Sequence, residues 1–206
     1  MNYSTLYIVR HGTTEWNAKG LIQGHMDSPL TEEGKEIARN LAKKFKNIKF
    51  DKIYSSDLLR AQKTAEIIAL EHDLLVETTK LLRERNFGTL EGKPSSEFKT
   101  INEILDKLTE EEIYTYKAHN FVDSDKDLME RFFTFIREVS LTNPGKTILL
   151  VTHGGIMRAA LIKLGVSSRE QLKHGAVQNG GYIKLKSDGV DFFVEETEGI
   201  VKKWIV

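Results

Sequence analysis

Two histidines follow short apolar runs, one near each end of the 206-residue chain, and each is followed by glycine. His11 comes after the run 6–9 and Arg10, whereas His153 closely follows the run 147–151. In open α/β sheets, ligands bind outside the carboxyl ends of the strands, where both histidines are expected. A histidine in this position suits a nucleophile, because the glycine after it lets a phosphate approach closely. Either histidine alone is equally compatible with a core-edge residue that hydrogen-bonds to backbone.

Two arginines make phosphate the expected target of this chemistry. Arg10 immediately precedes His11, and Arg60 falls in the first turn of a helix expected after another short strand. A guanidinium group offers a planar fork of donors that matches the oxygens of a phosphoryl group. Two such cations also neutralise the charge that develops on the transferred group. Arg60 by itself would more often be a solvated helix residue, so its significance comes from the set.

Glu84 is the candidate proton donor, because an alkoxide leaving group must be protonated as it departs. It lies in the segment 81–88 between two basic residues, Arg83 and Arg85. The alternative interpretation is a surface glutamate that pairs with one of these arginines.

Short β-rich runs alternate with helical patterns along the chain, which predicts a three-layer α/β/α sandwich around a mostly parallel central sheet. We expect strands at 6–9, 53–54, 74–76 and 147–151, and a hairpin formed by 182–185 and 192–195. These strands are the elements that must bring the two histidines to one edge of the sheet.

Helix starts are indicated by small polar residues. Thr31 is expected to cap one helix, and Ser55 or Ser56 is expected to cap the helix that carries Arg60. A later helix is expected to begin near Ile156, directly after the second histidine motif.

The segment from Gly92 to about Asp127 differs from the rest of the chain, with nine acidic residues, five lysines and no arginine. We interpret it as a helical insertion over the sheet and the active site, followed by a helix that resumes at Leu128. Because no linker or repeat interrupts the pattern, we expect one domain spanning residues 1–206.

Composition excludes several classes of protein. The absence of cysteine rules out disulfides, thiolate nucleophiles and cysteine-ligated zinc. A formal net charge of zero argues against a nucleic-acid or anionic-membrane partner. No apolar run approaches the roughly 20 residues that a membrane-spanning helix needs. No secretory leader pattern begins the sequence, so we expect a cytoplasmic location.

No cofactor or metal is expected. Neither a Walker A sequence nor a G-x-G-x-x-G pattern occurs. The remaining histidines are scattered and are best interpreted as solvated or capping residues: His25, His72, His119 and His174. The stretch Asp123–Asp127 lacks the glycine and the bidentate glutamate of a calcium loop, so we interpret it as the acidic, solvated start of the next helix.

Five sequence blocks, in order, resemble the histidine phosphatase superfamily in its phosphoglycerate-mutase-like branch. They are Arg10–Asn17, Gln23–Gly24 with Pro29–Gly34, Ser55–Ala61, Leu82–Glu84 with Phe87–Gly88, and Val151–Gly155. The resemblance covers roughly residues 5–92 and 147–185. Each block is weak alone, but five in the family's order make a specific signal.

The resemblance implies roles for individual residues. His11 matches the nucleophile, and Glu84 matches the usual proton donor. Arg10, Arg60 and His153 match the phosphate pocket, with Gly154 following the second histidine. Asn17 and Gln23 match positions that often add phosphate contacts.

The expected activity is metal-independent hydrolysis of a small-molecule phosphate ester through a phosphohistidine on His11. Two alternatives stay open. One is a cofactor-dependent phosphoglycerate mutase, for which Arg85 or Lys93 would have to hold a second phosphate. The other is a non-catalytic module that binds a phosphorylated ligand. The sequence indicates neither the individual substrate nor the oligomeric state.

Overall fold

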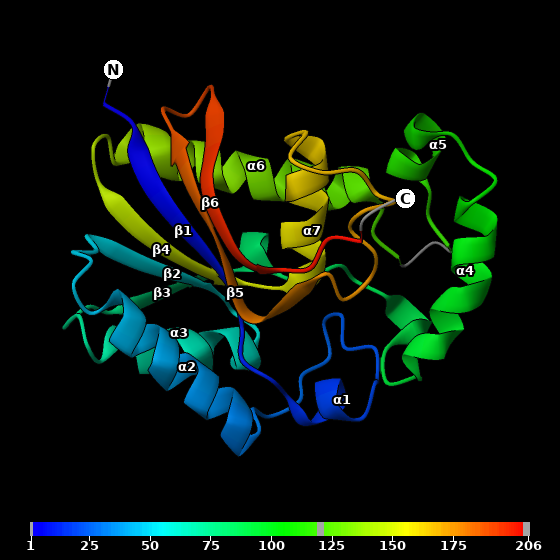
Figure 1. Ribbon diagram of the computed structural model, residues 1–206, viewed down its shortest axis with the longest axis horizontal. Helices are drawn as coiled ribbons and strands as arrows, with labels where there is room; N and C mark the ends of the chain where they lie inside the picture. The colour runs from blue at the N-terminus through cyan, green and yellow to red at the C-terminus, as the bar shows by residue number, and fades with distance from the viewer. Residues whose placement is uncertain (1, 119–121, 204–206) are drawn as a thin grey trace.

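The computed structural model describes residues 2–118 and 122–203 and contains a mixed six-stranded sheet (Figure 1). The strand order is β3-β2-β4-β1-β5-β6, in which β1 to β4 run parallel and β5 is antiparallel to both its neighbours. The strands are β1 (Ser4–Arg10), β2 (Lys52–Ser56), β3 (Val76–Thr79), β4 (Thr147–Thr152), β5 (Val177–Ser187) and β6 (Phe192–Ile200). The mostly parallel α/β sheet expected from the sequence is therefore confirmed.

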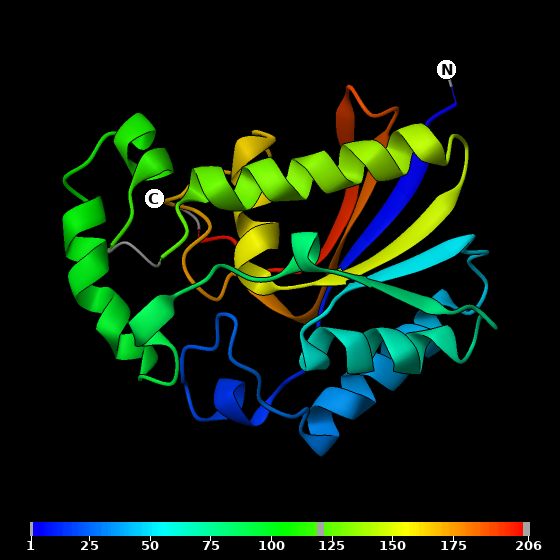
Figure 2. The same ribbon diagram turned by 180° about the vertical axis from the view of Figure 1, so that it is seen from behind.

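Helices cover both faces of this sheet, which makes three layers (Figures 1 and 2). One layer holds α2 (Glu32–Phe45) and α3 (Leu59–Ala69), and the other holds α6 (Asp125–Thr142) and α7 (Gly154–Lys163). Smaller helices are α1 (Glu15–Ala18), α4 (Phe98–Leu105), α5 (Glu110–Thr115), and the 3-10 turns η1 (Lys80–Leu82), η2 (Gly88–Leu90) and η3 (Ser95–Glu97).

The two central strands β1 and β4 are apolar on both faces because helices pack on each side. Leu6 and Ile8 of β1 enter the core under α6 and α7, whereas the alternate residues Tyr7 and Val9 enter the core under α2 and α3. Adjacent side chains of a strand point to opposite faces, so one uninterrupted apolar run supplies both cores.

The residues expected to cap helices and the expected strand and helix bounds agree with the structure at some positions and not at others. Thr31 caps α2, with its hydroxyl accepting from the Gly34 N–H at 3.0 Å, as expected. Neither serine caps α3, whose N-cap is Leu58 and has no side-chain hydrogen bond. β3 lies later than the expected 74–76, and α7 begins at Gly154 rather than Ile156.

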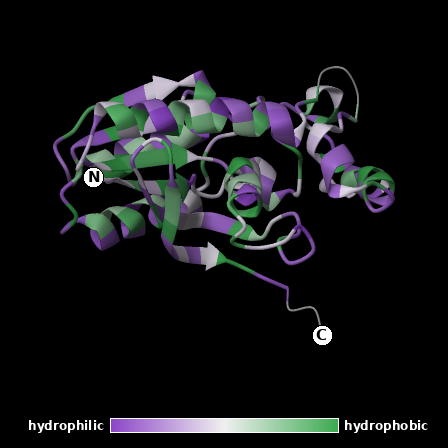
Figure 3. Ribbon diagram, turned by 90° about the horizontal axis from the view of Figure 1, so that it is seen from above, coloured by the Kyte–Doolittle hydropathy of each residue, from purple (hydrophilic) through white to green (hydrophobic). Residues whose placement is uncertain are grey.

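The insertion does not lie over the sheet. Its helices α4 and α5 lie at one end of the molecule, beyond the carboxyl ends of the parallel strands (Figures 1 and 3). There Ser95 and Phe98 reach the wall of a cavity at that edge. The helical insertion thus borders the site that the sequence predicted, from the side.

Within the described residues, no helix is both long and apolar enough to cross a membrane.

Candidate active site

The register of β1 on β4 brings the two histidine motifs together. Val9 lies opposite Val151 and Arg10 opposite Thr152, so both strands end at the same level of the sheet. The His11 N–H donates to the Thr152 carbonyl at 3.0 Å. As a result, the imidazole rings of His11 and His153 lie 5.2 Å apart between centroids.

His11 is held in one tautomer by its own loop. Its Nδ1 lies 2.7 Å from the Gly12 carbonyl oxygen, which only accepts, so Nδ1 must carry the proton. Nε2 is then left with a free lone pair, which is the form a nucleophile needs. Burial, reinforced by the positive charges of Arg60 and Arg10, holds the pKa of His11 well below its usual range. The imidazole is therefore neutral at pH 7.

The sequence suggested that Gly12 lets a phosphate approach closely, but in the structure Gly12 has a packing role. A Cβ atom at Gly12 would lie 2.2 Å from the Gly34 carbonyl oxygen, so the glycine permits close packing of the His11 loop on α2. The Gly12 N–H also donates to the Thr64 hydroxyl of α3 at 3.1 Å. These contacts fix the nucleophile loop against both helices of that layer.

Arg60 is buried in the first turn of α3, with only 2% of the residue exposed. Its Nη1 donates to Asp27 Oδ1 at 2.8 Å and its Nη2 donates to the Gly24 carbonyl at 2.7 Å. Asp27 also accepts from the Leu59 N–H at 2.7 Å, so it supplies the helix-start contact that neither serine provides. One loop therefore orients the guanidinium and begins the helix that carries it.

Several buried nitrogen atoms around the histidines have no hydrogen-bond partner within 2–118 and 122–203. They are Nε of Arg10, Nε of Arg60 and both ring nitrogens of His153. Burial lowers the pKa of Arg10 to about 10, against the opposing effect of Glu84, so it stays a cation at pH 7. A cluster of buried donors of this kind matches a tetrahedral anion.

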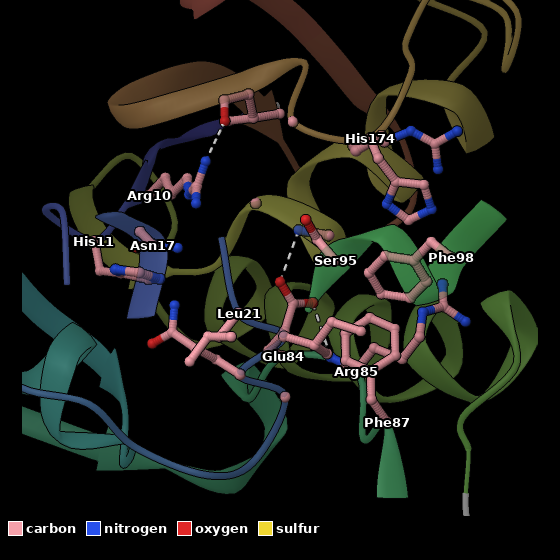
Figure 4. A pocket seen from close by; sticks show the side chains of 18 of the residues that line it. Arg10, His11, Asn17, Leu21, Glu84, Arg85, Phe87, Ser95, Phe98 and His174 are labelled. Atoms are coloured by element: carbon pink, nitrogen blue, oxygen red, sulfur yellow. Dashed lines mark hydrogen bonds between the residues drawn. The ribbon is translucent and has the colours of Figure 1, made fainter. Parts of the chain in front are cut away.

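Most of the predicted site residues line one cavity (Figure 4). Seven of the eight line it, namely Arg10, His11, Asn17, Gln23, Arg60, Glu84 and Gly154. The eighth, His153, is fully buried beside His11 and does not reach the cavity wall. In Figure 4, Arg10 and His11 lie at one side of the cavity and Phe98 and His174 at the other.

Glu84 lies between these two sides, with its carboxyl group fixed by backbone (Figure 4). Oε2 accepts from the Gly155 N–H and Oε1 accepts from the Arg85 N–H, each at 2.8 Å. A Cβ atom at Gly155 would lie 2.5 Å from Oε1, so the glycine makes room for the carboxyl group. Glu84 is therefore a cavity residue, and the alternative of a surface ion pair is wrong: Arg83 pairs with Asp57 and Arg85 with Asp125.

Asn17 and Gln23 are held indirectly next to the nucleophile. Asn17 closes a capping box with Thr14, whose hydroxyl also donates to Gln23 Oε1 at 3.0 Å. Asn179 Nδ2 donates to the His11 carbonyl at 3.0 Å and lies 3.4 Å from Asn17 Oδ1. Asn179 comes from β5, far away in sequence, and no local pattern predicts its contact with His11.

Three other residues at the site were not predicted from the sequence. Asp27 holds Arg60, as described above. Glu91 accepts backbone N–H groups from His25 at 2.9 Å, Met26 at 2.8 Å and Phe87 at 3.0 Å. Arg158 lines the cavity from α7. Arg158 follows the second histidine motif within one and a half turns of helix, and that spacing was the signal available.

The other histidines do not form a ligand set. Within the described residues, no three histidine or acidic side chains are placed to hold a metal. His25 Nε2 contacts the Glu84 carbonyl at 2.9 Å, and His174 stacks on Phe98 at 4.7 Å at the rim of the cavity. His119 lies outside the described residues.

The expected solvated state is wrong for Asp125, which is buried between Arg85 and Arg169.

Comparison with known proteins agrees with this geometry. Residues 6–198 match the family model of the histidine phosphatase superfamily, branch 1. The chain is 34% identical to phosphoglycerate mutase-like protein 4 of Arabidopsis thaliana over 82% of this chain and 75% of that protein.

Two solved structures share the fold. One is a phosphoglycerate mutase from Bacillus anthracis (TM-score 0.80, 28% identity, 97% of this chain and 94% of that one). The other is a phosphoserine phosphatase from Entamoeba histolytica in complex with 3-phosphoglyceric acid (TM-score 0.74, 27% identity, 94% and 96%). The chain therefore belongs to branch 1 of the histidine phosphatase superfamily, as its motifs, fold and site geometry require.

Proposed function

We propose that this protein hydrolyses small phosphate monoesters through a phosphohistidine on His11. The observation that carries the proposal is a neutral imidazole, with Nε2 free, flanked by the cations Arg10 and Arg60. Such an arrangement suits in-line attack on a phosphoryl group, because the nucleophile is unprotonated while the anionic phosphate is held by charge.

The reaction takes two steps. In the first, His11 Nε2 bonds to phosphorus, the ester P–O bond breaks, and Glu84 gives its proton to the leaving oxygen. In the second, water attacks phosphorus, Glu84 takes a proton from that water, and the P–N bond breaks. Inorganic phosphate leaves, and both residues return to their starting states.

Arg10 and Arg60 hold the transferred phosphoryl group in this scheme, with Asn17, Gln23 and the Gly154 backbone beside it. We assign His153 to the same phosphate pocket because it is buried next to His11 and, among the described residues, neither of its ring nitrogens has a partner. The guanidinium groups supply the positive charge that a metal ion supplies in other phosphatases. Activity should therefore survive EDTA, and vanadate should inhibit because it can adopt the five-coordinate geometry of the transfer. Loss of activity on chelation, with recovery on adding zinc or magnesium, would contradict metal independence.

Hydrolysis is preferred to mutase action because a mutase must also hold a second phosphate. Lys93 is exposed and does not line the cavity. Arg85 does line it, but its guanidinium is committed to Asp125 and to the Asp123 carbonyl. The insertion as a whole is net negative. These features favour water as the acceptor of the phosphoryl group, and the measurement of 2-phosphoglycerate below tests that preference against Arg158, the remaining arginine at the cavity wall.

The test has two arms. Rapid quench with ³²P-labelled substrate should trap an acid-labile, alkali-stable phosphoprotein that His11→Ala abolishes; normal turnover by His11→Ala would refute the mechanism. In the second arm, 3-phosphoglycerate is incubated with and without 2,3-bisphosphoglycerate, and free phosphate and 2-phosphoglycerate are measured separately. Fast bisphosphate-dependent formation of 2-phosphoglycerate would instead establish a mutase.

A further inference from the structure

The backbone around Glu84 is held by a single arginine from another element. Arg131 of α6 donates from Nη1 to the Leu81 carbonyl at 3.1 Å. The same nitrogen donates to the Arg83 carbonyl, and Nη2 donates to the Glu84 carbonyl at 2.8 Å. Arg131 does not line the active-site cavity, and its side chain is 19% exposed. The guanidinium group therefore reaches the candidate proton donor through the main chain.

Two of these carbonyls flank the Cα atom of Glu84. The Arg83 carbonyl belongs to the peptide unit before this Cα atom and the Glu84 carbonyl to the unit after it, and each peptide unit is planar and rigid. Holding both planes fixes the backbone dihedrals of Glu84, and with them the direction of its Cα–Cβ bond. One guanidinium group thus limits where the carboxyl group can point.

The second peptide unit also carries one of the two N–H groups that hold the carboxyl group. The Arg85 N–H, which donates to Glu84 Oε1 at 2.8 Å, shares its peptide unit with the Glu84 carbonyl. A hydrogen bond to that carbonyl polarises the unit and strengthens the N–H as a donor. His25 contacts the same carbonyl oxygen through Nε2 at 2.9 Å, and this nitrogen must carry the proton because a carbonyl only accepts. Arg131 and His25 therefore hold this peptide unit together.

The guanidinium group of Arg131 is itself oriented by a carboxylate. Asp123 Oδ2 lies 3.6 Å from Nη2 and also accepts from the Asn86 N–H at 3.0 Å. Burial lowers the pKa of Arg131, whereas Asp123 and Glu84 oppose the effect. Arginine stays charged at pH 7, so its hydrogen bonds to the carbonyls are charge-assisted and strong. The chain on both sides of Glu84 is therefore attached to the start of α6.

We propose that Arg131 is a positioning residue for the proton transfers of Glu84, acting through the main chain. This inference rests on the proposed hydrolase function and adds a residue to it. In the first step the proton of the Glu84 carboxyl group moves to the ester oxygen as the P–O bond breaks, and in the second step a proton returns from water. Both transfers need the carboxyl group within hydrogen-bond reach of that oxygen. Without Arg131 the reaction should lose proton transfer while phosphate binding by Arg10 and Arg60 persists.

The test is the dependence of the rate on the leaving group. Arg131→Met keeps an unbranched side chain but removes every donor. For alkyl phosphates, kcat/KM should fall by about 10- to 100-fold, as expected for a misplacement of up to about 1 Å. Nitrophenyl phosphate, whose leaving group needs little protonation, should lose less than about 3-fold. Arg131→Lys keeps the charge but loses the fork, so it should retain part of the activity on alkyl phosphates.

A double-mutant cycle with Glu84→Gln separates positioning from a general loss of structure. Once the proton donor is absent, Arg131→Met should cost alkyl phosphates no more than it costs nitrophenyl phosphate, because the two changes remove the same function. Arg137→Met is the matched control, since it removes an exposed arginine of the same helix that does not line the cavity. It should leave both kcat/KM values within about 2-fold of wild type.

An equal loss on both substrates in Arg131→Met, or full additivity with Glu84→Gln, would overturn the positioning role. If Arg131→Met does not fold, as judged by circular dichroism, Arg131→Lys decides through the same comparison of substrates. Rapid quench distinguishes this failure from a failure of the proposed function. A wild type that forms no phosphohistidine on His11 refutes the proposed mechanism and this inference with it. Normal phosphoenzyme formation, with an unchanged dependence on the leaving group in the Arg131 variants, refutes the positioning role alone.

Discussion

At the scale of single residues, the site depends on keeping one imidazole neutral next to two cations. The same Arg10 and Arg60 that attract phosphate also disfavour a proton on His11. The Gly12 carbonyl accepts a hydrogen bond from Nδ1–H, so Nε2 is available as the nucleophilic atom without a separate base. Glu84 is then required only for proton transfer to and from oxygen.

Glu84→Gln should show this division of roles, since the amide keeps the shape but has no proton to give. For alkyl phosphates, kcat should fall by about 10²- to 10⁴-fold, the range typical of general acid catalysis. Nitrophenyl phosphate, whose leaving group needs little protonation, should lose much less and serves as the internal control. An equal loss on both substrates, measured by steady-state phosphate release, would assign Glu84 another role.

At the scale of elements, Glu91 links the two loops that carry the chemistry. Its carboxylate accepts from His25 and Met26, whose loop supplies the carbonyl and carboxylate partners of Arg60. It also accepts from Phe87, three residues after Glu84. Glu91 therefore fixes the loop that holds Arg60 relative to the segment that carries Glu84, although Glu91 itself contacts neither reacting atom.

Glu91→Gln should weaken this link, because one carboxylate oxygen becomes an amide that cannot accept from the Met26 N–H. We expect weaker inhibition by vanadate and faster hydrogen exchange at the Met26 amide. The lost interaction is worth about 1.5–3 kcal/mol for a hydrogen bond to a charged group, less where solvent reaches it. Glu97→Gln, at an exposed glutamate of η3, is the control. Unchanged exchange at Met26 would remove Glu91 from this role.

At the scale of the whole molecule, burying the titratable and charged groups of the site carries a cost in the stability of the folded protein. His11 and His153 are buried together with Arg10 and Arg60, and burial is the largest cause of the lowered pKa of both histidines. Two apolar cores, one on each face of the sheet, offset this cost. Stability should therefore depend on pH in a window that the histidines set.

The direction of this pH dependence follows from the lowered pKa values of the two histidines. Below pH 6.5 the unfolded chain binds protons on both histidines while the folded protein does not, so stability falls as pH falls. The loss should approach about 1.4 kcal/mol per pH unit for each histidine until the folded pKa is reached. Urea unfolding at pH 7.5 and 5.5 in phosphate-free buffer measures it. The double variant His11→Gln, His153→Gln should show a smaller difference, and an identical pH dependence would contradict the explanation.

The sequence by itself determined the elements and the chemical identity of the site. Periodicity and apolar runs specify local structure, so the strands before His11 and His153 and the helix after Thr31 were predictable, because the forces that form them act between near neighbours. The strand that was misplaced, β3, has four residues and none of them is buried, so no apolar pattern indicates where it begins. The blocks that resemble the histidine phosphatase superfamily then predicted eight site residues, and seven of them line one cavity.

Only the tertiary structure decided how these residues are held and what else surrounds them. The partners of Arg60, the three amides on Glu91 and the contact of Asn179 with His11 join segments that are distant in sequence. The insertion was expected to lack the cations for a second phosphate, and it brings Ser95 and Phe98 to the cavity, whereas Arg158 reaches the same cavity from α7. Such contacts depend on which chain segments the sheet order brings together, and no local pattern encodes that order.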